Sequence, residues 1–202
     1  MSRADDFFAP PEGFRFDTFK NDRGQTLRYG HIKTSHTHPL GTMVLGPGYG
    51  EPIEKYFETI RDLTREGYNV YIMDWMGQGK SERMDPSEPH KPYDVQNFIE
   101  HHRDDLHHLV TKIVTVSEKE KLGYMGFSMG AHIGARFMER YSYIFDAASM
   151  SASFFDINSV GMPRAAVGGV AKTYRLRGKG RDFVPGGGPW SSLKQDFNKS
   201  KK

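Results

Sequence analysis

The residues that could do chemistry are centred on a serine flanked by glycines, in the sequence Gly126-Phe127-Ser128-Met129-Gly130. In the pattern G-x-S-x-G, the serine stands on a strained turn between a strand and a helix, and the glycines allow neighbouring backbone to approach closely. A serine hydroxyl must lose its proton as it attacks an ester carbonyl, and the oxyanion that forms needs donors already aimed at it. Ser128 is therefore the candidate nucleophile of a hydrolase.

The sequence on either side of Ser128 has the elements that this pattern requires. Residues 122–126 are predicted to form a strand and residues 129–141 the helix that follows it. The helix begins with small residues, which permit tight packing on a sheet: Gly130, Ala131 and Gly134. Ser128 is thus expected on the turn between the two elements.

The rest of the chain alternates between strands and helices. Strands are expected at residues 13–20, 25–32, 42–45, 69–73 and 147–152. Helices are expected at residues 54–66 and along a second apolar face that runs from Val95 to Val116. This alternation implies right-handed crossovers and a mostly parallel sheet covered on both faces, so the predicted class is α/β. The glycine-rich residues 161–188 are expected to hold short helices at most.

The composition narrows the class of protein. The 202 residues include no cysteine, which excludes disulfides, thiol catalysis and thiolate metal sites and favours a cytoplasmic location. The mean hydropathy is −0.65 and no apolar run approaches the roughly 18 residues of a membrane span, so a membrane-spanning segment is not expected. The first residues lack the apolar stretch of a secretory signal, so export through this end is not expected. Basic residues cluster at 175–181 and 199–202 without interleaved aromatics, which indicates a solvated tail rather than a nucleic-acid surface.

Two further segments resemble motifs of the monoacylglycerol lipases and bacterial lysophospholipases. Residues 47–56, PGYGEPIEKY, resemble the H-G-x-G-E oxyanion loop of this group, and residues 74–83, DWMGQGKSER, are similar to its D-x-x-G-x-G-x-S segment. The resemblance extends from about residue 13 to residue 197 and covers roughly the first two-thirds of a complete hydrolase domain. It implies an α/β-hydrolase core at residues 1–155, truncated after the sixth strand, and a partial lid and tail at residues 156–202.

The resemblance also implies the parts of the site. The backbone N–H groups of Tyr49 and Met129 would form the oxyanion hole beside Ser128. Pro47 stands where relatives usually have histidine, so the loop lacks that side chain's hydrogen bonds. Tyr49 and Phe127 could equally be simple packing residues. No cofactor is implied.

The order of catalytic residues in this fold is serine, then an acid, then histidine. His132 is the only histidine after Ser128, and it is expected one turn into the same helix, which is the wrong element for the base. Asp156 is expected to anchor the lid, because the family places its acid after the lid. The resemblance therefore places the acid and the base beyond Lys202, and we expect the chain to be a fragment.

Other sites fit the sequence less well. The segment Gly77–Ser81 ends like a phosphate-binding loop, but Asp74 occupies the position of its first glycine. A dinucleotide fingerprint starting at Gly46 would need a glycine at Glu51. Histidines and acids in two segments could in principle hold a metal, but packing or solvent-facing roles are favoured for all of them: His36, His38, His101, His102, Asp104, Asp105, His107 and His108.

Two functional classes remain open. One is a serine hydrolase of lipid esters, of the lysophospholipase or monoacylglycerol lipase type, with transient membrane contact through its lid. Within this class, a peptidase of the proline iminopeptidase type is an alternative, because it shares the same fold. The other is a non-catalytic hydrolase-like module that binds acyl ligands or a partner. The sequence does not determine the oligomeric state.

Overall fold

The computed structural model describes residues 9–87, 97–117, 120–153, 164–179 and 182. The chain divides into two compact units, one of residues 1–82 with 99–157 and the other of residues 83–98 with 158–202. Ser128, Tyr49 and Met129 all belong to the first unit. That unit also contains the whole sheet.

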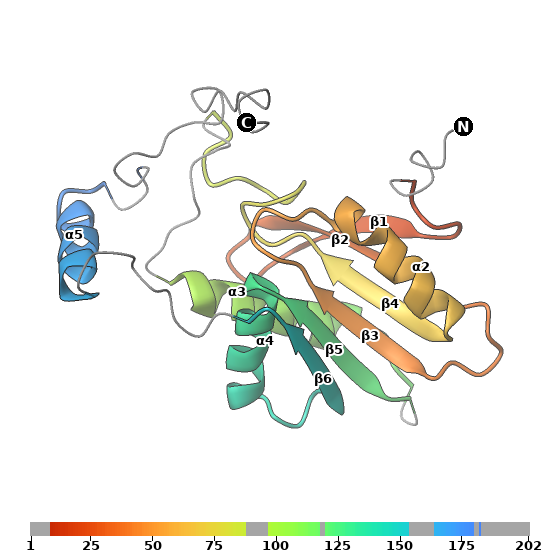
Figure 1. Ribbon diagram of the computed structural model, residues 1–202. Coiled ribbons are helices and arrows are strands. Elements are labelled where there is room, and N and C mark those ends of the chain that lie inside the picture. Colours follow the sequence, from red (N-terminus) through yellow and green to blue (C-terminus); the bar gives the residue numbers. More distant parts are fainter. Residues whose placement is uncertain (1–8, 88–96, 118–119, 154–163, 180–181, 183–202) are drawn as a thin grey trace, which may run out of the picture. The chain divides into compact units, whose positions relative to one another are not determined.

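Six strands form this sheet, in the spatial order β1-β2-β4-β3-β5-β6 (Figure 1). The strands are β1 Arg15–Lys20, β2 Thr26–Ile32, β3 Gly41–Gly46, β4 Tyr68–Met73, β5 Leu122–Phe127 and β6 Ala147–Ser151. β1 and β2 form the expected hairpin, and β2 runs antiparallel to β4. β3 pairs in parallel with both β4 and β5, and β5 with β6. The predicted α/β class with a mostly parallel sheet is confirmed.

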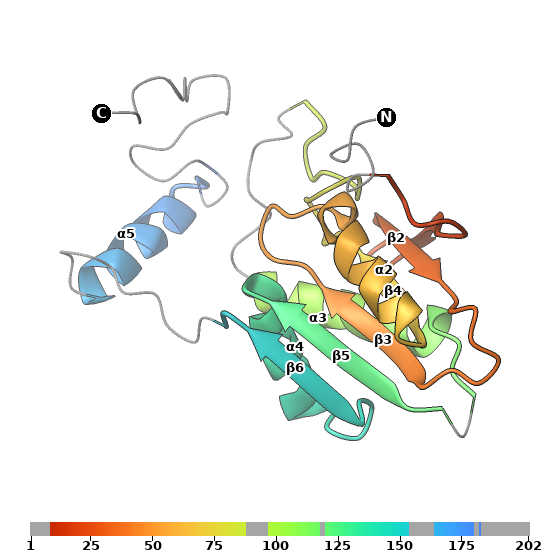
Figure 2. The ribbon, with the colours of Figure 1, turned by 45° about the vertical axis from the view of Figure 1, so that its right-hand side comes forward.

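Helices cover both faces of the sheet. On one face lies α2 (Phe57–Arg65), which follows a 3-10 turn at Ile53–Tyr56. On the other face lie α3 (Phe98–His108) and α4 (Met129–Arg140) (Figure 2). The core beneath α2 is formed by buried apolar side chains: Ile32, Leu45, Ile53, Phe57, Ile60, Val70 and Ile72.

The close approach of α4 to the sheet depends on small residues, as the sequence predicts. A Cβ built on Gly134 would lie 2.1 Å from Cε1 of Tyr124, the fully buried tyrosine of β5. The helix could not keep this position if residue 134 carried a larger side chain. The middle of α4 is thereby held directly against β5, the strand that precedes Ser128.

The helix expected along the Val95–Val116 face is shorter than predicted. α3 continues as a π-helical turn at Leu109–Ile113, and the backbone becomes extended at Val114, with φ −64° and ψ 121°. Val116 therefore lies outside the helix, and Val95 lies outside the described residues. Residues 114–116, Val-Thr-Val, are all β-branched, which disfavours continuation of a helix.

The second unit contains α5 (Arg164–Leu176), a helix of 13 residues where only short helices were expected. It ends in a left-handed turn at Gly178, with φ +69°, and the Lys179 amide donates to the Tyr174 carbonyl at 2.8 Å. This is the usual way in which glycine ends a helix. Among the residues described, no helix combines the length and the apolar character needed to cross a membrane.

Candidate active site

Ser128 stands alone between the last residue of β5 and the first residue of α4. Its backbone angles are φ +51° and ψ −114°, which non-glycine residues rarely adopt. Such a conformation costs on the order of 1–3 kcal/mol and persists only where the surrounding structure enforces it. The strained strand-turn-helix geometry predicted from the G-x-S-x-G sequence is present.

Two backbone hydrogen bonds hold this turn. The Ser128 amide donates to the carbonyl oxygen of Ser151, at the end of β6, at 2.9 Å. The Ser128 carbonyl accepts from the His132 amide at 3.1 Å, which is the first bond of α4. The turn is therefore fixed both to the neighbouring strand and to its own helix.

The start of α4 also packs on the loop of residues 46–51, which we call the Tyr49 loop. A Cβ built on Gly130 would lie 2.0 Å from the carbonyl oxygen of Gly46 and 2.6 Å from that of Pro47. Tyr124 adds a hydrogen bond from its hydroxyl to the Gly130 carbonyl oxygen, at 2.6 Å. The second glycine of the motif thus lets the Tyr49 loop and the turn at Ser128 meet.

Hydrogen bonds occupy the amides on both sides of Tyr49. The Gly48 amide donates to Glu51 Oε2 at 3.0 Å and to the Tyr56 hydroxyl at 3.1 Å, and the Gly50 amide donates to Gln78 Oε1 at 2.5 Å. Among the described residues, the amides of Tyr49 and Met129 have no hydrogen-bond acceptor. These are the two N–H groups that the resemblance assigns to an oxyanion hole.

Glu51 is the acidic residue of the Tyr49 loop, and its carboxylate accepts several hydrogen bonds there. Its carboxylate accepts hydrogen bonds from the Lys55 ammonium, the Tyr56 hydroxyl and the Gly48 amide. Burial raises the pKa of Glu51, but these hydrogen bonds outweigh burial and hold the pKa below its ordinary value. Burial, together with the bond to Glu51, raises the pKa of Tyr56 far above its ordinary value. Glu51 is therefore a charged acceptor that holds the loop.

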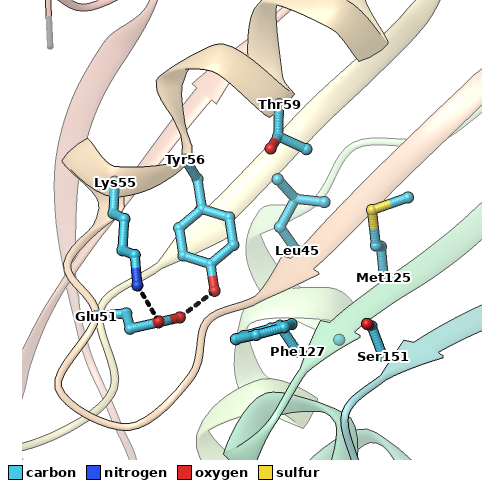
Figure 3. A pocket seen from close by; sticks show the side chains of 9 residues that line it. Leu45, Glu51, Lys55, Tyr56, Thr59, Met125, Phe127 and Ser151 are labelled. Carbon is cyan, nitrogen blue, oxygen red and sulfur yellow. Dashed lines mark hydrogen bonds and ion pairs between the residues drawn. The ribbon is translucent and has the colours of Figure 1, made fainter. Parts of the chain in front are cut away.

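A cavity of about 290 Å³ lies beside the turn, on the sheet face that α2 covers (Figure 3). Figure 3 shows Glu51, Lys55 and Tyr56 on one side and Leu45 and Met125 on the other. The complete lining is Leu45, Glu51, Lys55, Tyr56, Thr59, Met125, Gly126, Phe127 and Ser151. Most of this wall is apolar, so the cavity suits a hydrocarbon group better than an ion.

The segment after β4 holds the Tyr49 loop in place through hydrogen bonds. Asp74 is fully buried; its Oδ2 accepts from Arg28 Nε at 2.7 Å and its Oδ1 from the Ile53 amide at 2.9 Å. Burial raises the pKa of Asp74 above its ordinary value even though Arg28 and the backbone donors oppose the shift. Trp75 then donates from Nε1 to the Pro47 carbonyl oxygen at 2.8 Å. Residues 74–75 thus tie the Tyr49 loop to the sheet.

Sequence reasoning missed this support. The sequence places Asp74 at the start of the D-x-x-G-x-G-x-S segment but gives it no structural role, and it does not single out Arg28. The first residue of the D-x-x-G-x-G-x-S segment was the available signal for Asp74. No signal identified Arg28, because its partners lie 26 and 46 residues away in the sequence.

The other candidate residues are not gathered at Ser128. His132 lies on α4, as expected, and Asp156 lies outside the described residues. Asp105 is buried and accepts from Asn21 and Arg23, while His108 stacks on Phe19 with ring centroids 5.0 Å apart. Across the described ranges, no three histidine or acidic residues are grouped as a metal site would require.

The two uncertain aromatic residues are not core residues. Tyr49 has 62% of its surface exposed and Phe127 has 40%. Phe127 does line the cavity, whereas the Tyr49 side chain has no contact of that kind. Phe127 therefore lies at the cavity, and Tyr49 is exposed in its loop.

Comparison with models of known families assigns the chain to one family. A family model described as serine aminopeptidase, S33, matches residues 37–181. The chain belongs to this family. The match spans the Tyr49 loop, the Asp74 segment and Ser128, and it confirms the resemblance to α/β-hydrolases.

Two relatives carry the lysophospholipase name. The chain is 25% identical over 187 residues to the probable lysophospholipase L2 of Haemophilus influenzae, covering 93% of this chain and 58% of that protein. It is 30% identical over 168 residues to lysophospholipase L2 of Escherichia coli K12, covering 83% of this chain and 48% of that protein. The chain therefore spans about half the length of these relatives.

Solved structures show the same fold. A thermostable carboxyl esterase from Bacillus coagulans matches with a TM-score of 0.66 at 18% identity, over 85% of this chain and 53% of that one. An α/β-hydrolase from Penicillium sp. sh18 matches with a TM-score of 0.59 at 21% identity, over 82% of this chain and 55% of that one. These likenesses establish the α/β-hydrolase fold.

Proposed function

We propose that the chain carries the nucleophile and the oxyanion hole of a serine hydrolase that cleaves lipid esters. The observation that supports this most strongly is the strained backbone of Ser128, at φ +51° between β5 and α4. The helix that follows packs on the loop that carries Tyr49, and the amides of Tyr49 and Met129 are both without an acceptor in the described part of the chain. Strain of this kind is typical of functional sites.

In the proposed reaction, Ser128 Oγ attacks the ester carbonyl carbon while a base takes the hydroxyl proton. The carbonyl π electrons move onto oxygen, where the N–H groups of Tyr49 and Met129 stabilise the negative charge. Collapse of this intermediate expels the alcohol, which takes the proton from the base, and leaves an acyl ester on Ser128. Water, activated by the same base, then releases the fatty acid.

The base and the acid that orients it are proposed to lie in the part of the relatives that this chain does not span. His132 follows Ser128 by one turn on the same helix, so it moves with the nucleophile and stands on the wrong element for the base. By the same proposal, residues 1–155 belong to the hydrolase core and residues 156–202 to the lid and tail. A cytoplasmic location and transient membrane contact through the lid belong to this proposal as well.

The substrate class is proposed from the relatives. Those named lysophospholipase L2 act, by that name, on phospholipids with one acyl chain. We propose monoacyl esters, either lysophospholipids or monoacylglycerols, as the substrates of the whole protein. Amide substrates of the proline iminopeptidase type are the alternative that the family name keeps open.

A fluorophosphonate probe tests the nucleophile. It bonds to an activated serine Oγ through phosphorus as fluoride leaves, and the hydroxyl proton passes to solvent. We expect the longest product of the gene to be labelled at Ser128 and the Ser128→Ala variant to be unlabelled. The present chain is expected to label very roughly 10⁴-fold or more slowly, because a missing triad member costs about that much.

The same preparation tests the substrate class. Comparing kcat/KM on p-nitrophenyl esters of increasing acyl length with kcat/KM on proline naphthylamide separates the two readings. We expect the esters to be preferred. A longest product that is folded but neither labelled at Ser128 nor active on either series would establish a non-catalytic module instead.

A further inference from the structure

We propose that Gln78 is the positioning residue of the oxyanion hole, an inference that rests on the proposed function of Ser128. Gln78 belongs to the segment after β4 and is buried, with 8% of its surface exposed. Its Oε1 accepts from the Gly50 amide at 2.5 Å, and its Nε2 donates to the Met129 sulfur at 3.7 Å. One side chain therefore bridges the two segments that carry the proposed oxyanion donors.

Gln78 is itself held on a rigid turn. Its amide donates to the Trp75 carbonyl at 2.9 Å, and its carbonyl accepts from the Ser81 amide at 3.1 Å. The glycines on either side have positive φ, +78° at Gly77 and +50° at Gly79, so the turn is tight. Through Asp74, this turn is anchored to Arg28 in the sheet. The backbone of Gln78 is thus held in place, and this limits the positions that its side-chain amide can take.

The tip of the Tyr49 loop, at Tyr49 and Gly50, needs such a support, because side-chain packing contributes little there. The Tyr49 side chain is 62% exposed, and Gly50 has no side chain and a φ of +72°. The peptide groups around Tyr49 are therefore oriented by hydrogen bonds, with Glu51 and Tyr56 holding the Gly48 amide and Gln78 holding the Gly50 amide. Releasing the Gly50 amide would let the peptide next to Tyr49 rotate.

Two substitutions separate the bridge from simple packing. Gln78→Met has a side chain of similar length that cannot accept the Gly50 hydrogen bond. Gln78→Glu retains an acceptor for that bond and serves as the conservative variant. Gln25→Met makes the same exchange at the hairpin turn, where Gln25 bonds to Asn21 and Arg23 away from the site, and controls for loss of a glutamine.

Amide hydrogen exchange on the present chain is the first measurement. We expect Gln78→Met to raise exchange at the Gly50 amide at least about 10-fold, while Gln25→Met leaves it unchanged and Gln78→Glu restores its protection. Melting temperatures of all variants show whether any has simply lost its fold. Unchanged exchange in a folded Gln78→Met variant would overturn the bridge.

Labelling of Ser128 in the longest gene product is the second measurement. A positioning role predicts that Gln78→Met lowers the limiting rate of fluorophosphonate labelling about 10- to 100-fold with little change in the half-saturating concentration. An unchanged limiting rate would overturn the proposal for Gln78 and leave Ser128 as the nucleophile. Absence of label at Ser128 in the unsubstituted product would instead overturn the proposed function and with it the role of Gln78 at an oxyanion hole; exchange would then show only whether Gln78 holds the loop.

Discussion

Ser128 and Ser151 are joined by a backbone hydrogen bond of 2.9 Å, from the amide of the first to the carbonyl oxygen of the second. The bond connects the carboxyl ends of β5 and β6, and Ala152 follows directly with φ +53°. Ser128 and Ala152 are the non-glycine residues with positive φ in the described part of the chain. The strained turn at Ser128 is therefore tied to a second strained residue at the end of the neighbouring strand.

Glycine at either strained position should stabilise the fold. We expect Ala152→Gly to raise the free energy of unfolding by about 1 kcal/mol, because glycine adopts positive φ without a steric penalty. Ser128→Gly should likewise be more stable than Ser128→Ala by about 1 kcal/mol. Urea unfolding followed by circular dichroism measures both differences.

The control for this prediction is Ala148→Gly, at a paired position within β6. Ala148 has no positive φ, so glycine there should lower stability by about 0.5–1 kcal/mol through the added freedom of the unfolded chain. Equal losses at Ala148 and Ala152 would mean that Ala152 is not strained.

A methyl group at Gly130 should separate the start of α4 from the Tyr49 loop. The Cβ of Gly130→Ala would lie 2.0 Å from the Gly46 carbonyl oxygen, and backbone cannot move aside as a flexible side chain can. We expect a loss of stability of about 1–3 kcal/mol, typical of an overpacked site, and a loss of Ser128 labelling in the longest gene product. Gly168→Ala in α5 is the matched control, because a Cβ there meets nothing within 4 Å. It should be neutral or slightly stabilising.

The features of the candidate site that could be predicted from the sequence are those encoded by residues close together in the chain. The turn at Ser128 follows from five consecutive residues and from the change of apolar period between β5 and α4. Such features depend on residues close in the chain, so their geometry can be predicted from the sequence. Tyr49 was placed only through the resemblance, since nothing local marks its amide as free.

The supporting contacts were not predictable in the same way. The bond of Gln78 to Gly50 spans 28 residues and that of Arg28 to Asp74 spans 46, and neither pair has a pattern that names its partner. The periodicity of α3 predicted an apolar face, but not the π-helical turn that ends it before Val116. Contacts between distant segments depend on how the elements pack, which a periodic pattern does not specify.

Breaking the buried ion pair of Arg28 should be costly. Arg28→Met leaves the fully buried Asp74 without its charged partner and also releases Glu54. Removing one partner of such a pair costs about 3–5 kcal/mol, because an uncompensated charge remains buried. Arg65→Met, which removes an exposed pair with Asp62, should change stability by less than about 1 kcal/mol. Similar losses from both variants in urea unfolding would show that burial of Asp74 does not matter.

Asp105 holds the hairpin of β1 and β2 against α3. Its Oδ1 accepts from Asn21 Nδ2 at 2.9 Å and pairs with Arg23 at 2.5 Å, while its Oδ2 is buried without a partner among the described residues. Burial raises the pKa of Asp105 to about 6, and the bonds from Arg23 and Asn21 only partly oppose this effect. The carboxyl group therefore takes up a proton more readily in the folded chain than in the unfolded chain.

This difference predicts how stability depends on pH. Between pH 3.8, the ordinary pKa of the group, and about 6, the folded chain binds more protons at Asp105 than the unfolded chain, so the free energy of unfolding should fall as the pH rises and stay lower above pH 6. A shift of this size corresponds to about 2–3 kcal/mol. Asp105→Asn keeps the acceptor for Asn21 and Arg23 but carries no charge, so it should remove this slope and be more stable than the unsubstituted chain at pH 7. Asp104→Asn, at a more exposed neighbour, should retain most of the slope. Urea unfolding at pH 4, 5, 6 and 7 measures all three chains, and an Asp105→Asn variant that is less stable at pH 7 would show that the ion pair with Arg23 outweighs the cost of burial.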